Sequence, residues 1–326
     1  MKNIYTVKPY QVSCKSEWNE FVSNSKNATF LFNREFMDYH NDRFDDFSLM
    51  IYDDKKLIGL LPANIKDNVL YSHQGLTYGG LLLNGNTKFK VVLKSFESVL
   101  KYLNQRDIKT LHIKQIPVIY NKIPSDEVQY LMFLLEAELE KRDQLSVINL
   151  KERVKFSKNR LEGCNRANKH GLIVKEEHNF DSFWNEILIK NLYEKHNATP
   201  VHSLEEIKLL KSRFPKNIRQ FNVYDGNKIV AGTTVFESKN VAHSQYISGN
   251  EDKNTLGSLD VLHARLIENV FAHKTYFDFG VSTENGGKQV NYGLQFWKEG
   301  FGARTITQDF YKLKTENFKK LESVLL

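Results

Sequence analysis

The chain has 326 residues, of which 41% are hydrophobic and 12% aromatic, so it can bury the cores of one large domain or two ordinary ones. Its formal net charge of +7 is moderate: it suits a phosphate-bearing ligand but does not require one. The two cysteines, Cys14 and Cys164, stand far apart without metal-ligand spacing, so we expect neither a disulfide framework nor a metal. No apolar run resembles a signal peptide or a membrane span, and we expect a soluble cytoplasmic protein.

A repeat is the first feature met along the chain. Residues 52–73 (YDDKKLIGLLPANIKDNVLYSH) and 224–245 (YDGNKIVAGTTVFESKNVAHSQ) share Tyr-Asp-x-x-Lys, an aliphatic pair and Asn-Val at the same offsets. Asp-Asp-Lys-Lys and Asp-Gly-Asn-Lys are turn sequences, and apolar runs follow each. Each copy therefore predicts a β-hairpin that continues into a third strand.

The elements after each copy also correspond. A glycine-rich loop at 73–80 precedes a helix predicted over 88–105 by its apolar periodicity, and then a strand at 110–116. After the second copy come the loop 248–258, a helix predicted at about 258–273, and the strand 275–281. The shared order of strands, loop, helix and strand predicts a duplicated α/β unit.

A linking region separates the two copies. It comprises a proline-containing stretch, a helix predicted at about 125–142 and a strand at 146–150. We therefore expect two domains, at 1–150 and 151–326, in an α/β (α+β) protein whose mixed, mostly antiparallel sheets are flanked by helices.

The duplicated unit resembles the GNAT acyltransferase fold, and the C-terminal half is similar to the FemABX-like branch of that superfamily. The residues that carry this resemblance are Phe277-Asp278-Phe279-Gly280, followed by Asn291 and Trp297-Lys298-Glu299-Gly300-Phe301-Gly302. The stretches 72–80 and 196–207 also resemble FemAB-like proteins of bacterial polysaccharide pathways. The chain departs from the Fem ligases in having no long coiled-coil arm.

The resemblance implies a cofactor-binding loop at the start of the second unit's helix. In GNAT proteins this loop holds the pyrophosphate of coenzyme A on backbone N–H groups at a helix N-terminus. Here it corresponds to Asn254, Thr255, Leu256, Gly257 and Ser258, but only one of the family's glycines is in place. An alternative interpretation, a turn at Gly257 and a helix cap at Ser258, stays open.

Three residues are candidate catalytic groups. Lys298 matches the Fem-type lysine credited with stabilising developing charge, although it could equally be a solvated helix residue. Asp278 is a candidate base at a strand end, with a turn-capping role as the alternative. His243 is a candidate base in the strand that borders the acyl group in GNAT proteins, since histidine side chains in general can take up a proton near neutral pH, although a single strand histidine is more often structural. Trp297 stands near the position where GNAT enzymes often place a tyrosine acid, so no general acid is assigned.

The resemblance also implies substrate-binding positions. His196 and His202 bracket a loop that would contact the acceptor, while Ser203 and Glu206 predict a capping box for a helix at 203–213. In the basic segment 151–171, Arg160 and Arg166 would grip substrate phosphates, unless this is a solvated helix face. Tyr78, in the loop 72–80, is the last of the candidate substrate-binding residues.

The resemblance implies an N-acyltransferase that uses acetyl-CoA or another acyl-CoA to acylate an amine on a nucleotide-linked or lipid-linked sugar or other cell-envelope precursor. Two alternatives stay open: a Fem-type transferase that uses aminoacyl-tRNA, and a non-catalytic binding protein on a degenerate tandem fold. We expect no DNA partner and no integral membrane segment. The other protein-kinase motifs are absent from the sequence, so the letters Asp278-Phe279-Gly280 do not indicate a kinase.

Overall fold

A computed structural model describes residues 5–326, apart from the side chains of residues 195 and 196. The described residues form two compact units, one of residues 5–143 and 307–326 and one of residues 144–306. Residues 307–326, which the expected boundary gives to the second unit, belong to the first. There β17 (Arg304–Lys314) pairs with β8 (Thr110–Lys114), and the turn η8 (Thr315–Leu321) contacts α3 (Phe89–Asn104).

The first unit contains two sets of strands. One is the antiparallel sheet β1-β3-β4-β7, and the other has the order β17-β8-β6-β5-β2, in which β6 and β8 are parallel. Its remaining elements are β1 (Tyr5–Pro9), η1 (Val12–Cys14), α1 (Lys15–Asn24), η2 (Phe30–Phe32), α2 (Arg34–Met37), η3 (Asp38–His40), β2 (Asp45–Asp46), β3 (Leu49–Asp53), β4 (Lys56–Leu61), β5 (Asn64–Lys66), β6 (Val69–Tyr71), β7 (Leu82–Leu83), η4 (Val118–Tyr120), α4 (Glu127–Leu134) and the beginning of β9 (Glu138–Asn149).

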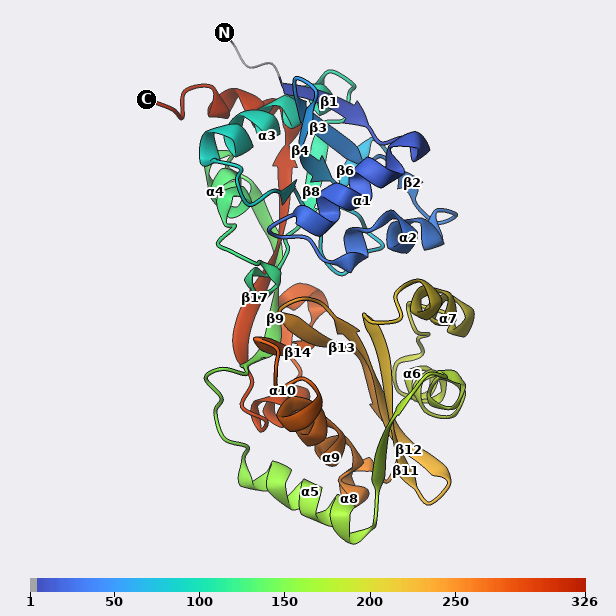
Figure 1. Ribbon diagram of the computed structural model, residues 1–326. Helices are drawn as coiled ribbons and strands as arrows, with labels where there is room; N and C mark the ends of the chain where they lie inside the picture. Colours follow the sequence, from blue (N-terminus) through green and yellow to red (C-terminus); the bar gives the residue numbers. More distant parts are fainter. Residues whose placement is uncertain (1–4) are drawn as a thin grey trace. The chain divides into compact units, whose positions relative to one another are not determined.

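The second unit has the strand order β10-β11-β12-β13-β14-β9, antiparallel except for the pair β13 and β14. Helices cover both faces of this sheet, with α9 and α10 on one side and α6 and α7 on the other (Figure 1). Its elements are α5 (Lys158–Lys169), β10 (Ile173–Glu177), η5 (Phe183–Leu188), α6 (Ile189–His196), α7 (Leu204–Arg213), β11 (Ile218–Asp225), β12 (Lys228–Glu237), β13 (Val241–Gly249), α8 (Lys253–Leu256), α9 (Ser258–Arg265), η6 (Leu266–Val270), β14 (Tyr276–Val281), β15 (Thr283–Glu284), η7 (Asn285–Gly287), β16 (Gln289–Val290) and α10 (Tyr292–Glu299).

The mixed α/β fold predicted from the sequence is confirmed, and so are the two hairpins of the repeat. Asp53 faces Lys56 across the turn between β3 and β4, and Asp225 faces Lys228 between β11 and β12. Each hairpin leads through further strand residues and a loop to one long apolar helix, α3 or α9 continued by η6. The capping box predicted for α7 is also present, since Ser203 and Glu206 bond each other's backbone N–H groups.

The helix predicted over 125–142 is wrong in its second half. α4 ends at Leu134, where Glu136 adopts a positive φ of 51° and the chain turns into β9. Residues 138–142 (ELEKR) are mostly good helix formers, but they belong to a strand of 12 residues. Pairing within a sheet overrides the local helix propensity, which is worth only a few tenths of a kcal/mol per residue, about 0.7 at most.

Two glycines let α5 pack directly on the start of α9. A Cβ added to Gly257 would collide with the carbonyl oxygen of Gly163, and a Cβ on Gly163 would collide with the carboxylate of Asp260. Gly257 also has a φ of +69°, which favours glycine. The α5–α9 contact therefore depends on the absence of side chains at both positions.

This contact predicts different costs for two glycine substitutions. Gly226 also has a positive φ of +57°, but no atom lies within 4 Å of an added Cβ. Gly226→Ala should lower the free energy of unfolding by about 1 kcal/mol, the cost of the left-handed backbone alone. Gly257→Ala should lower it by roughly 2–4 kcal/mol, because the collision with α5 is added. Urea unfolding measures both, and equal losses would show that α5 does not press on Gly257.

Candidate functional site

The parallel strands β13 and β14 diverge at one point in the second unit. Their register pairs Val241–His243 with Tyr276–Asp278, and β13 then continues to Gly249 paired with β12 alone. His243 and Asp278 are the last residues of the parallel ladder. Side chains and backbone groups just beyond this pair lie where the two strands open, which is a common place for ligands in α/β sheets.

The side chains of His243 and Asp278 are hydrogen-bonded to each other at this point. Nδ1 of His243 lies 2.9 Å from Oδ2 of Asp278, whose side chain is fully buried. The other carboxylate oxygen accepts the backbone N–H of Gly280 at 2.7 Å. Because Asp278 binds Nδ1, the ring is held as the tautomer with a proton there, and Nε2 has no recorded partner among the described residues. The imidazole can therefore accept a proton at Nε2.

Lys298 reaches the same place from α10. Its side chain is 2% exposed, and its ammonium donates to the carbonyl oxygens of Gly280 at 3.1 Å and Val281 at 2.6 Å. Burial lowers the pKa of Lys298 to about 8, partly opposed by the nearby charge of Asp278. The ammonium keeps one N–H without an acceptor in the described part of the chain, which it can direct at a negatively charged group.

The helix that carries Lys298 buries polar residues and exposes apolar ones. Gln295 and Lys298 are buried, whereas Tyr292 is 75% and Phe296 49% exposed. Gln295 accepts a hydrogen bond from Ser146 at 2.9 Å and donates to Glu299 at 2.8 Å. The side chain of Asn291 caps the helix by accepting the N–H of Leu294. An inward polar face is the reverse of an ordinary surface helix and indicates a functional cluster.

The structure thus brings together all three predicted catalytic candidates, His243, Asp278 and Lys298. The alternative of a solvated position for Lys298 is excluded by its burial. Asp278 accepts the backbone N–H of Gly280 within a bulge of β14 and also binds His243, while its role as a base stays a prediction. The pairing itself was missed by sequence reasoning, because the two residues are 35 positions apart.

The predicted pyrophosphate loop lies beside α5. Asn254 and Thr255 are exposed, but Leu256, Gly257 and Ser258 are buried. Arg166 donates to the backbone carbonyl of Asn254 at 3.1 Å. The turn at Gly257 is therefore used in the fold to admit α5, and the loop offers a ligand only its exposed first two residues.

Arg160 and Trp297 meet at Asp260, a carboxylate that the sequence did not indicate. Arg160 donates to Oδ1 at 2.5 Å and the indole of Trp297 donates to the same atom at 2.9 Å. Burial raises the pKa of Asp260, opposed by the charge of Arg160. Trp297, at the position expected for a tyrosine acid, thus anchors α10 to α9, and Arg160 is engaged inside the unit. No local signal could reveal these partners, which are 37 and 100 residues from Asp260.

His202 and Tyr78, two other predicted substrate residues, are buried and hydrogen-bonded to other side chains. His202 is 5% exposed, and its Nδ1 lies 2.6 Å from the hydroxyl of Tyr246. Tyr78 belongs to the first unit, is 2% exposed and hydrogen-bonds Thr29. The side chain of His196 lies outside the described residues. Within the described part of the chain, no group of three or more His, Cys, Asp or Glu residues could hold a metal.

Comparison with known proteins identifies the fold. Residues 164–298 match the model of an acetyltransferase (GNAT) domain. This segment contains His243, Asp278 and Lys298. The second unit is therefore similar to GNAT acetyltransferase domains. No curated protein matches its sequence.

Solved structures support the GNAT-type fold along the whole chain. FemX has a TM-score of 0.66 at 10% identity, covering 97% of this chain and 99% of its own. A C-terminal domain (DUF2156) assigned to a lysylphosphatidylglycerol synthetase from Agrobacterium fabrum has a TM-score of 0.59 at 11% identity, covering 95% and 96%. L-PGS from Bacillus licheniformis has a TM-score of 0.59 at 11% identity, covering 92% and 91%. In the described residues of this GNAT-type chain, no helix is long and apolar enough to cross a membrane.

The buried lysine of the GNAT-type unit predicts a measurable dependence of stability on pH. The pKa of Lys298 is about 8 in the folded protein and about 10.5 when unfolded, so the unfolded state binds its proton more tightly. Protonation of the buried Lys298 therefore lowers the free energy of unfolding. This penalty is fully present below a pH of about 8 and disappears as pH rises toward the unfolded pKa. Between about pH 7 and about pH 9.5, the free energy of unfolding of the wild-type protein should rise by about 2 kcal/mol relative to that of Lys298→Met. Urea unfolding at the two pH values measures this, and a constant difference between native protein and variant would contradict it.

Proposed function

We propose that the chain transfers an acyl group from an activated ester to an amine at the cluster of His243, Asp278 and Lys298. The supporting observation is that this cluster combines a histidine held in one tautomer, a buried carboxylate and a lysine ammonium with one unused N–H. A proton acceptor and a stabiliser of negative charge are the two groups that acyl transfer needs from the protein. Both lie at the opening between β13 and β14.

Each residue has a distinct role in the proposed reaction. The amine nitrogen forms a bond to the acyl carbon while Nε2 of His243 takes its proton, and Asp278 stabilises the resulting imidazolium. Lys298 donates a hydrogen bond to the oxyanion that develops on the acyl oxygen. The bond to the leaving oxygen then breaks, and that oxygen takes the proton back from His243. This cycle needs no tyrosine acid, which fits the presence of a tryptophan at position 297.

Among the possible donors, we favour an aminoacyl-tRNA over acyl-CoA. The buried turn at Gly257 lies against Gly163, so it gives little room for a pyrophosphate. The basic segment around α5 is exposed and includes Lys151, Lys155, Lys158, Arg166 and Lys169. Such a surface suits a polyanion, whose phosphates dominate binding. Acyl-CoA is the second candidate, since Asn254 and Thr255 stay exposed at the loop. For the acceptor we propose an amine on a sugar or another cell-envelope precursor.

A transfer assay distinguishes the two donors. Wild-type protein is incubated with a cell-envelope precursor extract and either radiolabelled aminoacyl-tRNA or radiolabelled acetyl-CoA, and label in the extract's amide products is counted. We expect transfer from aminoacyl-tRNA and none from acetyl-CoA. Transfer from acetyl-CoA alone would replace the donor proposed here, and transfer from neither would contradict the proposed function.

Substitutions in the cluster test its roles in the same assay. His243→Gln should lower the transfer rate by about 10²–10⁴-fold through loss of the proton acceptor. Lys298→Met should lower it by about 10²–10³-fold through loss of oxyanion stabilisation. The exposed residues His178 and Lys288 provide matched controls, and His178→Gln and Lys288→Met should leave the rate unchanged. Full activity in His243→Gln would exclude this histidine as the base.

A further inference from the structure

The first unit contains a cavity at the place that corresponds to the transfer cluster in the second. β6 and β8 are parallel, as β13 and β14 are, and their ladder ends at the pair Tyr71 and His112. Next to this pair lies a cavity of about 190 Å³, lined by side chains of β6, β8, β9 and β17 and by the loop after β6. An apolar cavity of about 150 Å³ is enough to hold benzene. The site lies wholly within the first unit.

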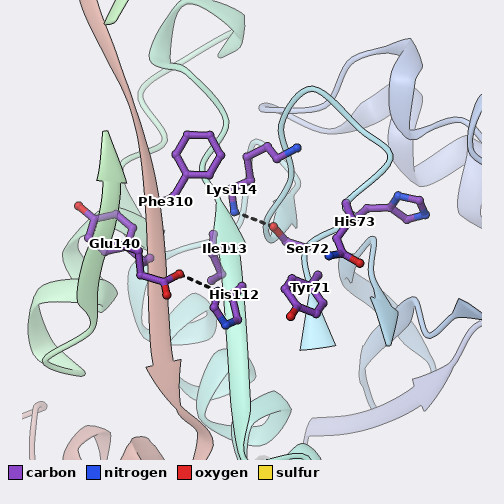
Figure 2. A pocket seen from close by; sticks show the side chains of 10 residues that line it. Tyr71, Ser72, His73, His112, Ile113, Lys114, Glu140 and Phe310 are labelled. Carbon is purple, nitrogen blue, oxygen red and sulfur yellow. Dashed lines mark hydrogen bonds and ion pairs between the residues drawn. The ribbon is translucent and has the colours of Figure 1, made fainter. Parts of the chain in front are cut away.

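The loop after β6 opens the cavity by leaving the sheet for a short distance. The hydroxyl of Ser72 accepts the N–H of Lys114 at 2.8 Å, in place of a backbone partner. The chain returns at Gly79, whose N–H donates to the carbonyl of Lys114 at 2.6 Å. His73 has a φ of +71°, and its ring points away from Phe310 (Figure 2). Backbone in a sparsely populated region costs roughly 1–3 kcal/mol and is concentrated at functional sites.

Flat side chains line the cavity. The rings of Tyr71 and His112 are stacked, with centroids 4.9 Å apart and an interplanar angle of 22°. The register of the strands places His112, Lys114 and Phe310 on the same face of the sheet as Tyr71. Figure 2 shows Phe310 and Lys114 on one side of the cavity and the stacked pair on the other. The lining therefore suits a ligand with a flat apolar body.

The charges around the cavity favour an anion. Nδ1 of His112 lies 2.7 Å from a carboxylate oxygen of Glu140, and Asp143 pairs with Lys141 at 2.7 Å, so each carboxylate already has a partner. Lys114 has no ion-pair partner in the described residues, and its ammonium donates once, to the carbonyl of Leu76 at 2.6 Å. Burial lowers the pKa of Lys114 to about 8; the charge of Lys141 also lowers this pKa, and the charge of Asp143 opposes the shift. An anion that accepted the remaining N–H groups would stabilise the charged form.

We propose that this cavity binds a small carboxylate with a flat apolar body, with its carboxylate on Lys114 and its body against Tyr71, His112 and Phe310. The site is separate from the transfer cluster, since every residue in it belongs to the first unit. It does not depend on the proposed transfer reaction or on its donor.

Calorimetric titration of the full chain tests the ligand class with three probes of similar shape. Benzoate should bind with a Kd of about 1 mM or lower. Benzyl alcohol lacks the charge and should bind at least about tenfold more weakly, and benzylamine, a cation, should not bind. Binding of benzylamine as tight as that of benzoate, or no benzoate binding at about 20 mM, would overturn the proposal.

Variants locate the bound probe. Lys114→Met keeps the apolar stem and should weaken benzoate binding at least about tenfold, while leaving benzyl alcohol unchanged. Lys101, exposed on α3, provides the matched control, and Lys101→Met should change benzoate binding less than about twofold. Tyr71→Leu provides a second variant should Lys114→Met not fold, and it should weaken both benzoate and benzyl alcohol. Benzoate binding that neither cavity variant weakens would place the probe elsewhere and overturn the proposal.

Discussion

The carboxylate of Asp278, fully buried on β14 beside the parallel strand β13, is the group around which the candidate cluster of the second unit is built. An unpaired buried charge costs several kcal/mol, so the surrounding structure must supply hydrogen bonds and an opposite charge. The N–H of Gly280 and the ring of His243 supply two of these partners. The bulge of β14 at Gly280 that presents this N–H also directs the carbonyls of Gly280 and Val281 at the ammonium of Lys298. One buried acid therefore fixes the histidine, the bulge and the lysine together.

The same requirement explains why α10 has its polar side inward. The ammonium of Lys298 can be buried only where hydrogen-bond acceptors are present. The carbonyl oxygens of Gly280 and Val281 are these acceptors. Gln295 continues this polar side toward Ser146 of β9. The position of the helix is fixed on its other side by the hydrogen bond from Trp297 to Asp260, which also binds Arg160 of α5. α5, α9 and α10 are thus connected through a single carboxylate.

The features that could be predicted from the sequence are those determined by residues close together along the chain. The hairpin turns, the apolar helix α3 and the capping box of α7 follow from local spacing, and they are confirmed. Residues 138–142 were mispredicted because strand pairing, which overrides their helix propensity, is set by distant residues. The three catalytic candidates were found through motif resemblance, but their contact was not, because His243, Asp278 and Lys298 lie on three separate elements. Asp260 gave no signal at all, since only its distant partners Arg160 and Trp297 reveal its role.

The two units contain the same arrangement of parallel strands but differ in what fills the opening between them. In both, a parallel pair of strands ends and opens, at His243 and Asp278 in one case and at Tyr71 and His112 in the other. In the second unit a helix inserts its lysine into the opening and the polar groups satisfy each other. In the first unit the lysine comes from the strand β8 itself, so no inserted helix fills the space and a cavity remains. A lysine from a helix yields a compact cluster suited to proton transfer, whereas a lysine from a strand leaves room for a ligand.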